Sequence, residues 1–126
     1  MHKVMEKTLN KMFEQQEEFM LLLKQHRNFP NWPIDIKSKA GQQLCREIVF
    51  SSVEEYFEAL QHLKNWKSHR VTEVKKIQKD KFLEELCDML HYFIELLIVV
   101  GIRPDELYDA YMKKGKINEE RIKGNY

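Results

Sequence analysis

Two pairs of acidic residues have a spacing that puts both members of each pair on one face of a helix. Glu55 and Glu58 are three residues apart, with Glu54 beside them, and Glu85 and Asp88 repeat that spacing. Residues three apart on a helix have Cβ atoms about 5–6 Å from one another. If the two helices pack antiparallel, the carboxylates converge and repel, and a divalent cation relieves the repulsion. Oxygen-only ligands favour Mg²⁺, or Mn²⁺, over zinc, and Mg²⁺ in turn recruits substrate phosphates.

The second acidic pair, Glu85 and Asp88, lies in the most apolar part of the chain. An isolated acidic pair with this spacing usually lies on a solvated helix surface, and the apolar surroundings of this pair argue against that interpretation. Apolar side chains between Phe82 and Ile98 cover nearly every face of the expected helix, which is typical of a helix at the centre of a fold. Burying unpaired carboxylates costs free energy, so these acids need a solvated groove or a cation. His91, one turn after Asp88, is expected to satisfy a hydrogen bond in the core, against the alternative that it orients a ligand carboxylate.

Apolar residues recur at three- and four-residue steps along most of the chain, which predicts an all-α fold. The first helix is expected over residues 4–28 and ends before the proline-rich segment 29–33. Ser38 is a suitable N-cap for a second helix, which is expected to run to about Trp66. A polar and basic loop, with at most a short helical turn, follows at residues 67–79.

The second half of the chain is expected to hold two more helices. The third covers residues 81–100 and ends at Gly101, since glycine tolerates the left-handed conformation that closes many helices. The fourth covers residues 104–114 and ends at Gly115, with a polar tail after it. Four helices leave the apolar third helix incompletely covered, so we expect a four- to five-helix bundle that dimerises.

The composition is that of one globular domain spanning residues 1–126. Hydrophobic residues make up 43% and charged residues 33% of the chain, and the formal net charge is +1. This balance gives no support for direct nucleic-acid binding or for a membrane surface as partner. The apolar run from Tyr92 to Ile102 is too short to span a bilayer, and no targeting segment is recognisable. Cys45 and Cys87 are too far apart for a CxxC motif, which favours the reducing cytoplasm.

The acidic motif and its neighbours resemble the all-α nucleoside triphosphate pyrophosphohydrolases, which include MazG, the dCTPases and the dimeric dUTPases. The resemblance is greatest to the dimeric dUTPase branch and covers residues 40–126. The segments that carry it are Glu54-Glu55-x-x-Glu58, Lys64-Asn65-Trp66-Lys67, Leu83 to Tyr92 around Glu85-x-x-Asp88, and Tyr111-x-x-Lys114-x-x-x-Asn118-x-x-Arg121-x-x-Gly124-x-Tyr126.

The resemblance implies Mg²⁺-dependent hydrolysis of a deoxynucleoside triphosphate, dUTP first, to the monophosphate and pyrophosphate. In that family the acids hold several Mg²⁺ ions, and a carboxylate on the first metal helix activates a water for attack at the β-phosphorus. By match, Glu58 is the candidate catalytic base and also a metal ligand. Glu55, Glu85 and Asp88 are the other candidate metal ligands. The implied assembly is a homodimer or a dimer of dimers.

The C-terminal signature supplies groups that suit a nucleotide. Lys114 and Arg121 are cations suited to phosphate oxygens. Asn118 suits a sugar hydroxyl or a phosphate, and Tyr126 suits stacking on a base or ribose. Trp66, at the end of the second helix, is a candidate for one wall of a base pocket, against the alternative of a partly buried tryptophan at a helix end. These residues are the expected substrate-binding set, against the alternative of a frayed basic C-terminus.

The base preference depends on the first helix. Gln15 and Gln16 lie near the position where dUTPases place a base-reading glutamine, and Gln15 is our candidate for substrate binding. Those enzymes have asparagine three residues later, where this chain has Glu18 or Phe19. A dCTP-preferring or broad dNTP pyrophosphohydrolase with the same acids therefore stays open as the alternative.

Two other classes of protein have less support. A non-catalytic helical adaptor with this fold is expected to lack one of the acids, and all of them are present. A di-iron carboxylate bundle needs Glu-x-x-His motifs, and Asp88-x-x-His91 is the only near match. No phosphate-cradling P-loop occurs. Short relatives in the resembling family are bacterial or phage-encoded, so the expected location is the cytoplasm, or the host cytoplasm for a phage protein.

Overall fold

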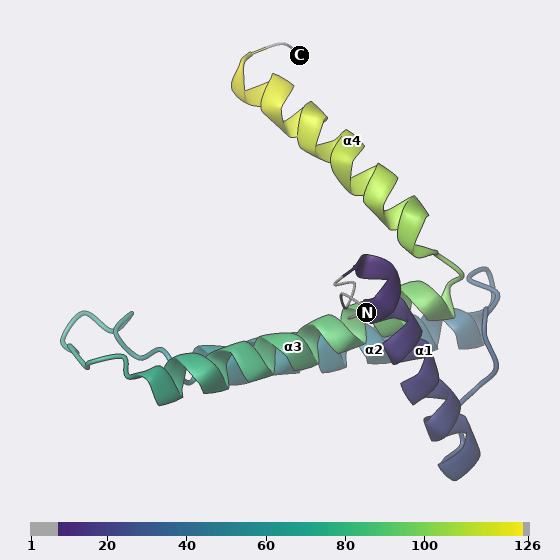
Figure 1. Ribbon diagram of the computed structural model, residues 1–126, viewed down its shortest axis with the longest axis horizontal. Coiled ribbons are helices and arrows are strands. Elements are labelled where there is room, and N and C mark those ends of the chain that lie inside the picture. The colour runs from purple at the N-terminus through teal and green to yellow at the C-terminus, as the bar shows by residue number, and fades with distance from the viewer. Residues whose placement is uncertain (1–7, 125–126) are drawn as a thin grey trace, which may run out of the picture.

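The computed structural model describes residues 8–124, which form four α-helices and no strand (Figure 1). The predicted all-α fold is therefore confirmed. In chain order the helices are α1 (Leu9–His26), α2 (Lys39–Leu60), α3 (Lys76–Val99) and α4 (Pro104–Ile122). α2 and α3 lie side by side as a long antiparallel hairpin, α1 crosses one end of this hairpin, and α4 projects away from it (Figure 1).

The core lies where α1 crosses the C-terminal half of α3. The last turns of α3 are buried, whereas Leu83 nearer its start is 60% exposed. The predicted central position of the third helix thus applies to its second half only. Segment 27–38 closes over this end, and the Ile34 N–H donates to the Val99 carbonyl at 2.8 Å. The buried cluster consists of Phe13, Met20, Ile48, Ile94, Leu97, Ile98 and Val99.

The first two helices begin at side-chain caps. The Thr8 hydroxyl accepts from the Lys11 N–H at 3.2 Å, and the start expected at residue 4 lies outside the described residues. α1 ends at His26, two residues before the predicted end. Ser38 is the N-cap of α2, as predicted, and its Oγ accepts from the Gly41 N–H at 2.9 Å.

The turn between α2 and α3 differs from the prediction at both ends. α2 ends at Leu60 instead of about Trp66, and α3 begins at Lys76 instead of residue 81. The Asn65 side chain bonds to the backbone of Thr72, which competes with helix formation at the end of α2. The Gln78 carboxamide accepts from the Lys75 N–H at 3.1 Å, which caps the start of α3.

The two predicted glycine stops have different outcomes. Gly101 follows α3 with a φ of +84°, as expected of a left-handed helix end. Gly115 does not end α4, which continues to Ile122, so most of the expected polar tail is helical. The glycine that follows the end of α4 is Gly124, whose φ is +77°. A glycine ends a helix only where it takes up the left-handed conformation, and Gly115 remains helical.

The chain is unusually open. It exposes 10802 Å², about half again the roughly 7,100 Å² expected of a compact monomer of this mass. Among the helices, α4 contacts only α1 (Figure 1). In the part of the chain that the structure describes, no helix has an apolar stretch long enough to cross a membrane.

Gly41 allows a close approach at the start of α2, and Gly41→Ala is expected to lower the melting temperature. An added Cβ would clash with the Asp35 carbonyl oxygen and lie 2.9 Å from the capping Ser38 Oγ. Overpacking of this kind costs about 1–3 kcal/mol. Gly115→Ala is the matched control, because no atom lies within 4 Å of its added Cβ and alanine is favoured inside a helix. Thermal unfolding followed by circular dichroism measures both, and equal melting temperatures would contradict the clash.

Candidate functional site

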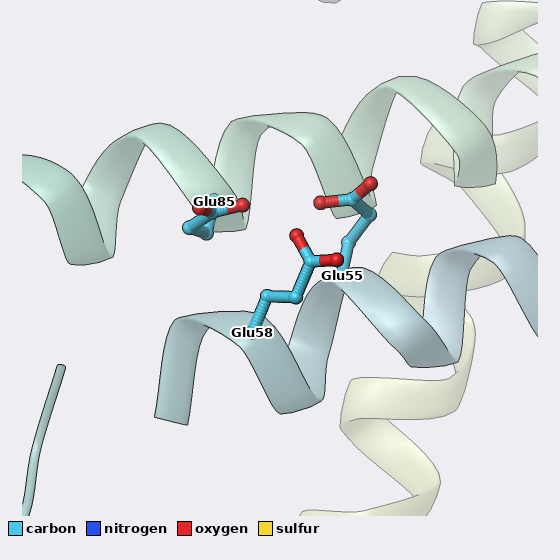
Figure 2. A group of neighbouring side chains, drawn as sticks. All are labelled: Glu55, Glu58 and Glu85. Atoms are coloured by element: carbon cyan, nitrogen blue, oxygen red, sulfur yellow. The ribbon is translucent and has the colours of Figure 1, made fainter. Parts of the chain in front are cut away.

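Three of the four predicted acids meet between α2 and α3. Glu55 and Glu58 point from α2 toward Glu85 on α3 (Figure 2). One carboxylate oxygen from each lies within 4.8 Å of the other two. The i, i+3 spacing on α2 puts Glu55 and Glu58 on the face that α3 covers, and the antiparallel hairpin brings Glu85 opposite them. The convergence predicted from the two motifs is therefore present for these residues.

Burial and the neighbouring acids raise the proton affinity of Glu55. The pKa of Glu55 is raised from 4.5 to about 7, first by burial and then by the Glu58 carboxylate, with smaller contributions from Glu85 and Asp88. Near neutral pH the cluster therefore holds a proton unless a cation takes its place. Carboxylate oxygens at this separation suit a hard divalent ion such as Mg²⁺. Acidic clusters also occur without any ion, so the Mg²⁺ site stays a prediction.

Asp88 lies beside this group and not within it. Its side chain is exposed and lines the same cavity as Glu55, and its charge contributes to the raised pKa of Glu55. Among the described residues, the group close enough to share one ion consists of Glu55, Glu58 and Glu85. His62 is a further neighbour, with Nε2 at 3.9 Å from Glu85 Oε1.

A cavity of about 580 Å³ opens beside the acids, between α1 and α3. Gln15 lines it, as expected of a substrate-binding residue, but the buried glutamine is Gln16, which is 2% exposed. Gln16 Oε1 lies 2.9 Å from His91 Nδ1. His91 therefore has a hydrogen-bond partner, but it is an exposed residue at the cavity and not in the core as predicted, and its partner is a side chain that the prediction had not selected. Phe13, Gln16 and Met20 share the buried stripe of α1, and this helical spacing was the signal for Gln16.

Glu95 is the second polar residue in this cavity that the sequence reasoning did not select. Its side chain is 6% exposed, and burial raises its pKa. Tyr92 lines the same cavity, and its pKa is raised by burial and by the nearby carboxylates, Glu55 first. A carboxyl group and a phenol in one cavity supply hydrogen-bonding groups for a polar ligand edge.

Trp66 does not line the cavity between α1 and α3 that contains Gln15, Gln16 and Glu95, here called the Gln16 cavity. It is 78% exposed and lines a different cavity, of about 340 Å³, at the end of α2 with Phe57, Lys64 and Arg70. The Lys67 ammonium lies 5.6 Å from the centroid of the Trp66 ring. Within one copy of the chain, the predicted base-pocket wall is therefore separate from the glutamines of α1.

The predicted residues of α4 are not gathered at the acids of their own chain. Lys114, Asn118 and Arg121 lie in the second half of α4, which projects from the rest of the molecule (Figure 1). Tyr126 lies outside the described residues. A site that uses both α4 and the acidic group needs α4 from another copy or a movement of α4.

Glu55→Gln is expected to stabilise the metal-free chain above neutral pH. The folded-state pKa of Glu55, about 7, is higher than its ordinary 4.5. The stabilisation from the bound proton is therefore present at acidic pH and lost as the pH rises through about 7. Glutamine carries no charge, so with EDTA the variant should melt above wild type at about pH 8 and close to it at about pH 4. A wild-type chain that melts higher at the alkaline pH would contradict this electrostatic strain.

No protein family, curated protein or solved structure matches the chain. The resemblance to the all-α pyrophosphohydrolases rests on the sequence motifs and stays a prediction.

Proposed function

We propose that this chain is an Mg²⁺-dependent pyrophosphohydrolase that converts a deoxynucleoside triphosphate, dUTP first, to the monophosphate and pyrophosphate. The observation that carries the proposal is the acidic group, with oxygens of Glu55, Glu58 and Glu85 all within 4.8 Å of one another across two helices. A cluster in which the pKa of Glu55 is raised to about 7 is one that a divalent cation would stabilise. The predicted role of Asp88 as a further ligand belongs to this proposal.

Glu58 has the exposure that a general base needs. It is the exposed member of the group, while Glu55 and Glu85 are partly buried, so its carboxylate is open to a solvent water. Glu58 takes a proton from that water as the water oxygen bonds to the β-phosphorus. The bond from the β-phosphorus to the bridging oxygen breaks, and the monophosphate leaves with that oxygen. Mg²⁺ bound to the acids would lower the pKa of water and neutralise phosphate charge.

The Gln16 cavity is the proposed base pocket. Because Gln16 Oε1 faces His91, its Nε2 amide group is the one left to donate toward the cavity. Such a donor matches a carbonyl oxygen, which uracil carries at the ring position where cytosine carries an amino group. Glu95 lines the same cavity and supplies a second polar contact. These groups support dUTP ahead of dCTP.

We propose a homodimer, with the MazG-like bundle completed by the second copy. The exposed area exceeds that of a compact monomer by more than a standard interface, about 800 Å² per partner, would cover. An apolar stripe, the outer α2 stripe, consists of Val49, Val53, Tyr56 and Leu60 and faces solvent. α4 likewise exposes apolar side chains that its own chain does not cover: Tyr108, Tyr111 and Met112.

The second copy would also complete the site. α4 carries the predicted phosphate ligands Lys114 and Arg121 but projects from its own chain (Figure 1). Docked on the partner, it would bring cations toward the partner's acids. The free thiols of Cys45 and Cys87 agree with the proposed cytoplasmic location, because reducing conditions keep thiols unpaired.

The proposal is tested by product release from dUTP, dCTP, dTTP, dATP, dGTP and UTP, each with Mg²⁺ and with EDTA. Monophosphate and pyrophosphate from dUTP, only with the metal, is the expected result. Release from several deoxynucleotides would keep the mechanism and change the specificity to the broad class. Release from none of them would overturn the proposal and favour the adaptor.

A further inference from the structure

The loop that joins α2 to α3, residues 61–75, is held in one shape by its own hydrogen bonds. The Asn65 Nδ2 donates to the Thr72 carbonyl oxygen, and the Asn65 Oδ1 accepts from the Thr72 N–H, both at 2.6 Å. Inside this closed segment, the Arg70 N–H donates to the Lys67 carbonyl at 3.1 Å. The backbone of Arg70 is therefore held by a hydrogen bond within the loop.

This loop and the first turns of α3 enclose a cavity of about 260 Å³. Lys64 and Arg70 line it, and Glu73 is the carboxylate among its lining residues. Within residues 8–124, neither the Lys64 ammonium nor the Arg70 guanidinium takes part in an ion pair. Lys67 is engaged differently, over the Trp66 ring. Two cations are thus available to an anion that enters the cavity.

The loop cavity adjoins the acidic group. His62 lines the cavity, and its Nε2 lies 3.9 Å from Glu85 Oε1. On α3, Gln78 lines the cavity and Glu85 follows seven residues later, which is about 10 Å along a helix. That distance is short enough for one nucleotide to contact both places.

The acidic group lies between two cavities of different character. Toward the C-terminal end of α3, the cavity is lined by neutral and acidic groups such as Gln16, His91 and Glu95, and by one cation, Arg27. Toward the start of α3, the loop cavity is lined by Lys64 and Arg70. An elongated ligand with a polar ring at one end and negative charge at the other matches this order along the hairpin.

We propose that the loop cavity is an anion subsite in which Arg70 and Lys64 bind the β- and γ-phosphates of the substrate and then the pyrophosphate product. This inference rests on the proposed function, and it adds Arg70, which is in none of the motif segments that carry the resemblance to the pyrophosphohydrolases. The guanidinium fork can bind two phosphate oxygens at once. Because the Asn65–Thr72 bonds already order the loop, less conformational entropy is lost when the anion binds.

The test is calorimetric titration of the full chain with inorganic pyrophosphate at constant Mg²⁺. Arg70→Ala is expected to weaken pyrophosphate binding by about 10-fold or more, the usual effect of losing a charged hydrogen bond. Arg70→Lys should be intermediate, because a point charge replaces the fork. Lys81→Ala is the matched control: Lys81 is also exposed and cationic but lines neither cavity. Binding of dUMP, which lacks the β- and γ-phosphates, should be unchanged in all variants.

The outcomes distinguish failure of the proposed anion subsite from failure of the proposed hydrolysis. Pyrophosphate binding that depends on Arg70, in a chain that releases no product from any nucleotide, would keep the subsite and overturn the proposed function. Hydrolysis of dUTP with equal pyrophosphate binding by wild type and Arg70→Ala would keep the function and overturn the subsite. No binding of pyrophosphate by the wild-type chain would overturn the subsite as well. Circular dichroism checks that Arg70→Ala is folded, and Lys64→Ala gives a second, independent variant.

Discussion

Glu58→Gln is expected to lower kcat by about 100- to 10,000-fold, the range that a general base contributes. The substitution keeps the shape of the side chain but replaces the group that accepts the proton. Glu58 is exposed, so the variant should fold normally. Without metal it should be slightly more stable, because one of the charges that raises the pKa of Glu55 is gone. Steady-state turnover of dUTP and thermal unfolding with EDTA measure the two effects.

The matched control is Glu54→Gln, which removes the same charge one residue away. Glu54 is exposed and lies outside the group of converging oxygens, so its variant should turn over substrate like wild type. An Mg²⁺ titration separates the two roles given to Glu58. If high Mg²⁺ restores turnover in Glu58→Gln, the residue acts as a ligand only, and wild-type turnover at all Mg²⁺ concentrations would refute both roles.

The acidic group was predictable because it depends on local spacing and one packing event. The i, i+3 pairs put Glu55 and Glu58 on one face whatever the tertiary structure. The packing event is the antiparallel return of α3 along α2 after the loop 61–75, which brings Glu85 opposite them. The errors at the ends of α2 and α3 do not affect this result, because all three acids still lie within the two helices, Glu58 in the last turn of α2.

The turn between the helices was harder to predict, since its shape depends on a contact between distant residues. Asn65 bonds to Thr72 seven positions later, and no periodic pattern marks such a pair. Gly115 was misleading for a related reason. Glycine only permits a left-handed helix end, and here the chain uses that freedom at Gly101 and Gly124.

The base pocket was only partly predictable. Gln16 shares the buried stripe of Phe13 and Met20, so helical spacing could have identified it as buried, but spacing says nothing of a partner such as His91. The separation of Trp66 from that pocket and the projection of α4 depend on how helices pack. A single chain leaves both α4 and the outer α2 stripe exposed, so their final environment depends on a second copy.

Mixed dimers of two inactive variants are expected to regain activity. One chain carries Glu58→Gln and the other carries Lys114→Ala with Arg121→Ala, and two affinity tags select dimers with one copy of each. If α4 acts on the partner's acids, one site of the mixed dimer combines intact acids with an intact α4. The other site has both defects. Such a dimer should show about half of the wild-type activity, since one of its two equivalent sites is complete.

A reciprocal dimer gives the opposite expectation and serves as the control. Here all three substitutions are on one chain and the partner chain is wild type. With α4 acting in trans, each site has one defect, so the dimer should be nearly inactive when dUTP is below KM. With α4 acting in cis, the wild-type chain keeps a complete site, and this dimer would be half active while the first would be inactive. The pair of measurements therefore assigns α4 to its own site or to the partner's, because each arrangement predicts activity in one dimer and its loss in the other.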